Sequence, residues 1–229
     1  MALFPVASEQ PTTRPAVANL TIIGLNIFIF LLELILGDAF INTWAFTPAH
    51  LTAFFNGTGS FQAVLTIFTA MFMHASFSHI FGNMLFLWVF GQAIENAFGS
   101  RPYTIFYLIC GVVANITQYL VDPNSAVPNL GASGAIAGVM GAYLALYPTS
   151  KIDLFVWPLS LFTRRDIRVP AWLMLGLWFA VQLFSGLGGM NGAGAAGGVA
   201  FWAHVGGFIA GLVLALLVRP GQRGALSAT

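Results

Sequence analysis

Six stretches of the chain consist almost entirely of apolar residues, and each is about as long as a lipid bilayer is thick. A helix needs about 20 such residues to cross the hydrocarbon, and in lipid only helices and closed barrels satisfy every backbone polar group. Charged residues make up 7% of the chain, against about a quarter in a soluble domain. We therefore expect an all-α, multi-pass membrane protein with spans over 17–37, 77–98, 102–121, 132–147, 169–189 and 198–218.

The Lys and Arg residues predict how this bundle is oriented. Cytoplasmic loops are enriched in these residues. With six spans and a cytoplasmic N-terminus, all eight lie on the cytoplasmic side: Arg14, Arg101, Lys151, Arg164, Arg165, Arg168, Arg219 and Arg223. Counting the apolar piece 61–73 as a seventh span would break this pattern, so we expect it to lie in the outer leaflet.

Three parts of the chain follow from this topology. They are a cytoplasmic N-terminal tail over 1–16, a six-helix membrane domain over 17–218 with a long, partly helical first outer loop over 38–76, and a cytoplasmic C-terminal tail over 219–229. The first apolar run is too long for a signal peptide and lacks an Ala-x-Ala exit. We expect a multi-pass protein of a cell membrane, namely a bacterial inner membrane.

Composition also excludes some classes of function. The net charge is +1, which predicts no nucleic-acid partner. The single cysteine, Cys110, permits no disulfide framework or thiolate cluster.

One serine stands where only small apolar residues are needed for helix packing. Gly131-Ala-Ser133-Gly134 opens the fourth span, which continues with glycine or alanine at every third or fourth position. Such spacing lets helices approach closely in lipid. On its own Ser133 is better explained as a helix cap or a small packing residue, but a nucleophile at a helix N-terminus would also benefit from the unpaired N–H groups there.

Polar residues at a similar depth in two other spans give this serine possible partners. His79 and Asn83 are four residues apart, on one face of the second span. His204 in the sixth span is followed by Gly207 and Gly211, which are spaced for close packing on the glycine-rich fourth span. Because a neutral imidazole beside a serine is a general base beside its nucleophile, the three spans together predict a catalytic site.

These motifs resemble the rhomboid family of intramembrane serine proteases. The similarity lies in His74…His79-x-x-x-Asn83, in Gly131-Ala-Ser133-Gly134 and in Ala203-His204 with Gly207 and Gly211, over roughly residues 65–215. The resemblance implies a rhomboid-like six-helix bundle with Ser133 as nucleophile and His204 as general base and acid. It also implies an oxyanion hole formed by the Ser133 backbone N–H with His79 and Asn83, and a structural role for Glu95.

The sequence departs from the family at two places. Where many members have an aromatic residue four positions after the serine, this chain has Ala137, so either another side chain holds the imidazole or the dyad is looser than usual. Trp-Arg in the first outer loop is replaced by Leu65-Thr66. Four further residues are candidates for supporting roles: His74, Gly131, Gly134 and Gln118, the last for holding a water or satisfying a loop.

The expected substrates are single-pass or multi-pass membrane proteins, cut near the outer leaflet. A transmembrane helix must unwind before it can present a peptide bond, so helix-weakening residues are expected near the cut. No cofactor or metal is expected, since an HExxH zinc motif is absent from the sequence. Two alternatives remain, an inactive relative that escorts transmembrane segments and a small transporter, for which no inverted repeat is visible.

Overall fold

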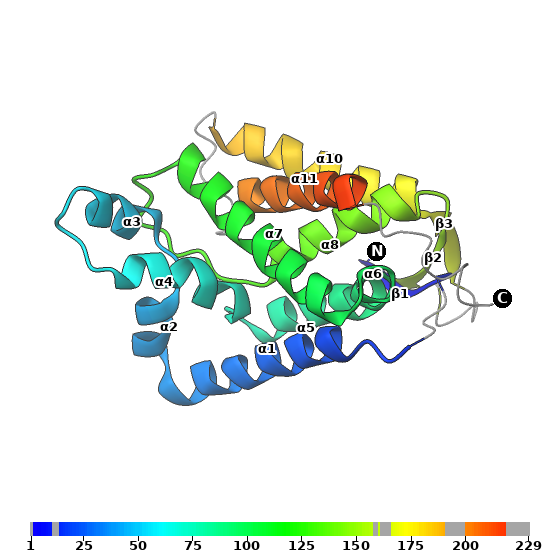
Figure 1. Cartoon of the computed structure of the whole chain (residues 1–229), viewed down its shortest axis with the longest axis horizontal. Helices are drawn as coiled ribbons and strands as arrows, with labels where there is room; N and C mark the ends of the chain where they lie inside the picture. The colour runs from blue at the N-terminus through cyan, green and yellow to red at the C-terminus, as the bar shows by residue number, and fades with distance from the viewer. Residues whose placement is uncertain (1, 11–13, 158–159, 161–165, 191–199, 219–229) are drawn as a thin grey trace.

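The protein is a bundle of membrane helices, and the computed structural model describes residues 2–10, 14–157, 160, 166–190 and 200–218 (Figure 1). Among these residues, five helical stretches are long and apolar enough to cross a membrane. They are α1 (Val17–Leu36), the continuous stretch Phe77–Phe98, α7 (Ser100–Val121), α10 (Ala171–Met190) and α11 (Phe201–Val218). The second consists of α5 (Phe77–Phe86), the π-helical turn η2 (Leu87–Gly91) and α6 (Gln92–Phe98).

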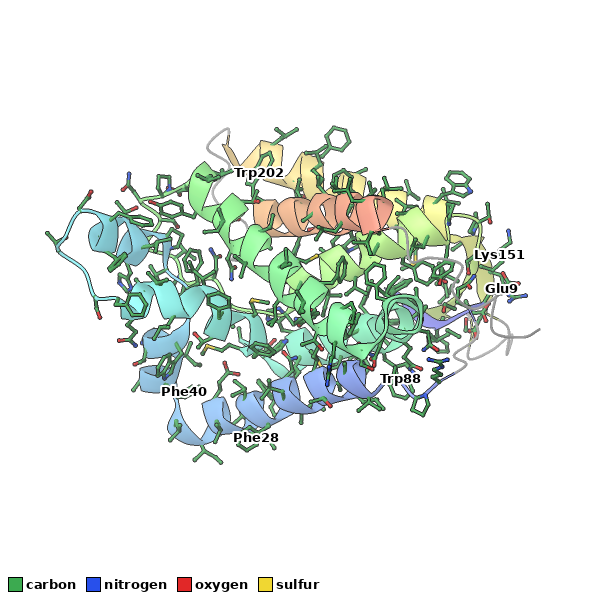
Figure 2. All side chains as sticks on the ribbon, viewed as in Figure 1. Glu9, Phe28, Phe40, Trp88, Lys151 and Trp202 are labelled. Atoms are coloured by element: carbon green, nitrogen blue, oxygen red, sulfur yellow. The ribbon has the colours of Figure 1, made fainter. Side chains whose placement is uncertain are left out.

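Large apolar side chains on the outer face of these helices fit a lipid environment. Phe28 on α1 and Trp88 on η2 are both more than half exposed, and Figure 2 shows Phe28 directed away from the bundle. Exposed apolar surface of this extent is unusual for a soluble protein. Together with the five long helices it supports the prediction of a helical, multi-pass membrane protein.

The shortest of the six predicted spans forms the centre of the bundle. Helix α8 (Ser133–Leu146) has 14 residues, and every residue from Gly134 to Tyr143 is buried. It packs against α11 and α7 and, less extensively, against α10.

Glycines bring α8 and α11 into backbone contact. A Cβ atom added to Gly207 would overlap the carbonyl oxygen of Gly134, and one added to Gly211 would overlap that of Gly138. Gly141 lies equally close to the carbonyl of Phe208. We call this contact the glycine interface; it permits the close van der Waals packing that holds helices together in lipid.

Helix α1 is held by buried polar groups instead. The Glu95 carboxylate on α6 accepts hydrogen bonds from the backbone N–H groups of Ala18 and Asn19 at 3.0 and 2.6 Å, and from the Ser100 hydroxyl at 2.6 Å. The Asn19 side chain in turn accepts from the Tyr103 hydroxyl at 2.7 Å and donates to the Leu87 carbonyl at 3.1 Å. Glu95 therefore caps the N-terminus of α1, where unpaired N–H groups favour a negative charge.

The segment between α1 and α5 is largely helical and lies at one end of the molecule (Figure 1). It contains α2 (Asp38–Trp44), α3 (Pro48–Phe55), α4 (Gln62–Thr69) and the 3₁₀ turn η1 (Ala70–Phe72). Phe46 pairs with Asn129 through two backbone hydrogen bonds, which tie this segment to the residues that precede α8.

A three-stranded antiparallel sheet lies at the opposite end of the bundle (Figure 1) and was not anticipated from the sequence. Its order is β1 (Ala2–Ser8), β2 (Lys151–Trp157), β3 (Ile167–Pro170). Glu9 and Lys151 meet beside it (Figure 2), where the Glu9 carboxylate accepts the Lys151 backbone N–H at 3.0 Å.

The helices of the third and fourth spans begin at Ser100 and Ser133, within two residues of the expected 102 and 132. The starts of the fifth and sixth spans also differ. The fifth span was predicted from residue 169, but Val169 and Pro170 complete β3 and the helix starts at Ala171. Val169 pairs with Ile152 in the antiparallel β2–β3 ladder, so Val169 is part of the strand and not of the helix. For the sixth span, 198 and 199 lie outside the described residues, and α11 begins at Phe201.

Candidate active site

A cavity of about 830 Å³ opens beside the N-terminal end of α8. Its volume is in the range of ordinary ligand pockets. The cavity is lined by residues of α5, α8, α10, α11 and the segment 127–130. Six of its lining residues carry polar or aromatic groups relevant to chemistry: His79, Asn83, Ser133, Trp178, Gln182 and His204.

Ser133 is the first residue of α8, and the backbone before it is fixed by a glycine. Gly131 has φ +139°, a conformation that L side chains rarely adopt, and its N–H donates to the Ala70 carbonyl at 2.9 Å. A Cβ at this position would lie 2.9 Å from His79 Nε2 and 3.5 Å from Ser133 Oγ. Gly131 therefore lets His79 approach the serine, because any side chain there would separate them.

The structure brings Ser133 and His204 into direct contact. The distance between Ser133 Oγ and His204 Nε2 is 2.7 Å, a short hydrogen bond between residues 71 positions apart in the chain. His204 lies in the first turns of α11, so the glycine interface sets its separation from α8. Gly134 also allows α7 to approach α8, because a Cβ added to it would overlap the Cβ of Ala114 on α7.

His79 and Asn83 both line the cavity, on one face of α5. Ser76 caps this helix by accepting the His79 backbone N–H at 3.2 Å. The Asn83 amide lies 2.9 Å from His74 Nε2, and the rings of His74 and His79 meet edge to face with centroids 5.1 Å apart. The three side chains form one cluster beside Ser133.

His74 connects this cluster to α1. Its backbone N–H donates to both oxygens of the Glu33 carboxylate, at 3.1 and 3.0 Å, which gives Glu33 a role that the sequence did not suggest. Burial, together with the nearby His79, lowers the pKa of His74 to about 3. A neutral His74 can accept a hydrogen bond from the Asn83 amide, so it acts on the cavity through Asn83.

His74, Gly131 and Gly134 are not among the described residues that line this cavity, but each lies beside one that does. Gln118 is the fourth predicted site residue outside the lining. It lies near the C-terminal end of α7, and it is not among the described residues that line the cavity.

Two cavity residues on α10 were missed by the sequence analysis. Gln182 Oε1 lies 2.8 Å from His204 Nδ1, and the Trp178 ring packs on the His204 ring with centroids 5.8 Å apart. They are four residues apart and therefore share a helix face. A glutamine inside an apolar span was the available signal, since polar residues in spans are costly and usually face the bundle interior.

Comparison with known proteins places this chain in a family. A family model for the rhomboid domain matches residues 62–221. The chain is 32% identical over 166 residues to Rhomboid-like protein 11, chloroplastic, of Arabidopsis thaliana, covering 69% of this chain and 54% of that protein. It is 31% identical over 156 residues to Rhomboid protein 1, mitochondrial, of Saccharomyces cerevisiae, covering 65% and 40%.

A bacterial relative is similar to the same degree. Rhomboid protease GluP of Bacillus subtilis is 32% identical over 152 residues, covering 66% of this chain and 26% of that protein. The chain thus spans about half or less of the length of these relatives.

Proposed function

Because the chain belongs to the rhomboid family, we propose that it is a serine endopeptidase that cuts membrane proteins within the bilayer. The observation that carries this proposal is the 2.7 Å contact between Ser133 Oγ and His204 Nε2 at the wall of a cavity between membrane helices. A serine touching an imidazole is a nucleophile with its base, and two residues suffice when both are positioned.

The proposed reaction has two steps. In the first, Ser133 Oγ forms a bond to the carbonyl carbon of the scissile peptide while its proton passes to His204 Nε2. His204 then gives this proton to the leaving amine as the C–N bond breaks, which leaves an acyl-enzyme. In the second step water attacks the ester, its proton passes through His204 back to Ser133 Oγ, and the carboxylate product leaves.

Charge on the carbonyl oxygen needs hydrogen-bond donors during both steps. The proposed donors are the Ser133 backbone N–H and the side chains of His79 and Asn83. Because Ser133 is in the first turn of α8, its N–H has no carbonyl partner within the helix. The position of both side chains on the cavity wall supports this assignment. Donors fixed in advance of the reaction are worth about 10²- to 10³-fold in rate each.

The proposed substrates are transmembrane segments that unwind easily near the site. A peptide bond in an intact helix has its polar groups paired, so glycine, proline or polar residues close to the cut would favour cleavage. The cavity lies toward the end of the bundle that carries α2, α3 and α4, while the sheet with Lys151 and Arg168 lies at the other end. With positive charge inside, we place the site near the outer leaflet of a bacterial inner membrane, with both termini cytoplasmic.

The test is cleavage of a transmembrane substrate by purified protein in liposomes. Ser133→Ala and His204→Ala should each lower kcat by at least about 10⁴-fold. Matched controls are Ser185→Ala on α10 and His50→Ala on the exposed face of α3, neither of which lines the cavity. Asn83→Ala should lose about 10²- to 10³-fold.

Two outcomes would contradict the proposal. Cleavage that persists in Ser133→Ala would remove Ser133 as nucleophile. Absence of cleavage by any version, with transmembrane segments still retained by the protein on purification, would favour the alternative of an inactive relative that escorts them.

A further inference from the structure

We propose that Gln182 on α10 is a positioning residue for the catalytic base, so that the site is a chain of three residues, Ser133, His204 and Gln182. Gln182 accepts the Nδ1 proton of His204 and thereby keeps the Nε2 lone pair directed at Ser133. This inference rests on the proposed function and adds to it a residue from a helix that carries neither the nucleophile nor the base.

Both ring nitrogens of His204 are engaged. Nδ1 lies 2.8 Å from Gln182 Oε1 and Nε2 lies 2.7 Å from Ser133 Oγ. A neutral imidazole has one N–H, and the hydrogen bond at one nitrogen determines the state of the other. Since an amide oxygen only accepts, the proton is on Nδ1, and Nε2 can accept the proton of Ser133.

The opposite orientation of the amide would disable the site. With the NH₂ group of Gln182 facing Nδ1, the ring proton would move to Nε2, where it would point at Ser133 Oγ. Ser133 would then face a donor and lack a base. The same fault, an amide that imposes the wrong tautomer, costs serine proteases about 10⁴-fold in kcat.

Trp178 supports the ring from the same face of α10. Its ring packs on His204 with centroids 5.8 Å apart and also reaches Phe208 on α11, at 6.1 Å. In the chain position where an aromatic residue would support the base from α8, there is only the buried Ala137. Helix α10 therefore supplies both the hydrogen bond and the aromatic contact that hold the imidazole.

A neutral partner suits the position of Gln182 in a membrane helix. A carboxylate there would be costly to bury in lipid, whereas an amide accepts the same hydrogen bond without a charge. It stabilises an imidazolium less than a carboxylate would, so its contribution is orientation and tautomer. Loss of Gln182 should therefore lower kcat and leave KM unchanged.

The experiment compares Gln182→Met, which keeps the length of the side chain and removes the acceptor, with Gln182→Glu, which keeps an oxygen acceptor. The matched control is Gln92→Met, the same change on α6, where the side chain donates to the Trp88 carbonyl and does not line the cavity. Cleavage kinetics in liposomes are combined with ¹⁵N NMR of the histidine rings, with the His204 signals assigned from His204→Ala.

We expect wild type to show His204 with its proton on Nδ1. Gln182→Met should lower kcat about 10- to 100-fold with KM unchanged, and should shift the proton toward Nε2. Gln182→Glu should restore the Nδ1 proton and turn over faster than Gln182→Met, and Gln92→Met should match wild type in both measurements.

Wild-type kcat in Gln182→Met, or an Nε2-protonated His204 in wild type, would overturn the inference. The spectra keep it separate from the proposed function, because they report the tautomer even if wild type cleaves no substrate. If Gln182→Met does not fold, the wild-type and Gln182→Glu spectra still decide.

Discussion

The α8–α11 contact and the contacts of α1 are stabilised by different interactions. Between α8 and α11, glycines at 207 and 211 bring the backbones into contact. Between α1 and the helices beside it, Glu95, Asn19 and Tyr103 form a buried hydrogen-bond network. The glycine contact sets the distance between the α8 and α11 backbones. The hydrogen-bond network determines which residues of the neighbouring helices α1 binds.

The difference corresponds to what each part of the bundle would have to do under the proposed function. Ser133 and His204 lie across the glycine interface, where a shift of about 1 Å can cost 10²-fold in rate. The polar network lies around α1, which carries neither residue, and its loss should affect stability before chemistry. The four predictions below test this division, from the largest expected effect to the smallest.

A leucine at position 211 should separate α8 from α11. In Gly211→Leu the new side chain overlaps the backbone of Gly138, so the helices must move apart, and activity should fall by at least about 10²-fold. Cleavage of the transmembrane substrate measures it. Gly24→Leu on α1, where an added Cβ meets nothing within 4 Å, should retain activity. An equal loss of cleavage activity in both variants would contradict the proposed difference between the glycine interface and the α1 side of the bundle.

Glu95→Gln should destabilise the protein while leaving its chemistry intact. The carboxylate accepts from two backbone N–H groups and one hydroxyl, and an amide replaces one acceptor with a donor. Leaving buried groups unpaired costs about 1–3 kcal/mol, so thermal unfolding should occur at lower temperature, with kcat retained below it. Asp122→Asn, at an exposed site, is the control, and a kcat loss without a stability loss would argue against this role.

The stability of the protein should also depend on pH through His74, whose backbone is hydrogen-bonded to Glu33 on α1. The pKa of His74 is lowered from 6.5 to about 3 by burial, so below pH 6.5 the unfolded state binds a proton that the folded state does not. The stability of wild type relative to His74→Gln should therefore fall as pH drops, by up to about 1.4 kcal/mol per unit. Unfolding of both proteins between pH 7 and 5 measures this, and a constant difference would contradict it.

The smallest effect is expected outside the bilayer. Arg168 on β3 pairs with Asp153 on β2 at 2.7 Å, and the carboxylate raises the pKa of the exposed guanidinium. Water competes for both groups, and exposed ion pairs often contribute nothing measurable. Arg168→Ala and Asp153→Asn should both unfold at the wild-type temperature. A large decrease in the unfolding temperature of either variant would mean that the sheet contributes to the stability of the bundle.

Hydropathy predicted the helices well because length and apolar content are local properties of the sequence. It missed the sheet, since β1 and β2 pair residues about 150 positions apart, such as Ala2 with Trp157, and the strands are too short to be distinctive. The start of α10 was misplaced for the same reason, as Val169 is apolar but belongs to β3.

The site was predictable to the extent that its residues lie in motifs. Ser133, His204, His79 and Asn83 were predicted as site residues from their motifs, and all four line one cavity in the structure, while their catalytic roles stay a prediction. Gln182 and Trp178 were not found because their role depends on how α10 is rotated about its axis against α11, which apolar content does not determine. Gln118, in a similar sequence context, lies away from the cavity lining described here.

The 14 residues of α8 rise about 21 Å, while the hydrocarbon layer is about 30 Å thick. A serine at the end of so short a helix is held at a set depth, whatever passes beside it. Under the proposed function, the peptide bond that reaches the serine then depends on bilayer thickness: in a thicker membrane, the same substrate would have a different residue at that level. Lipid chain length should therefore shift the cut along the substrate.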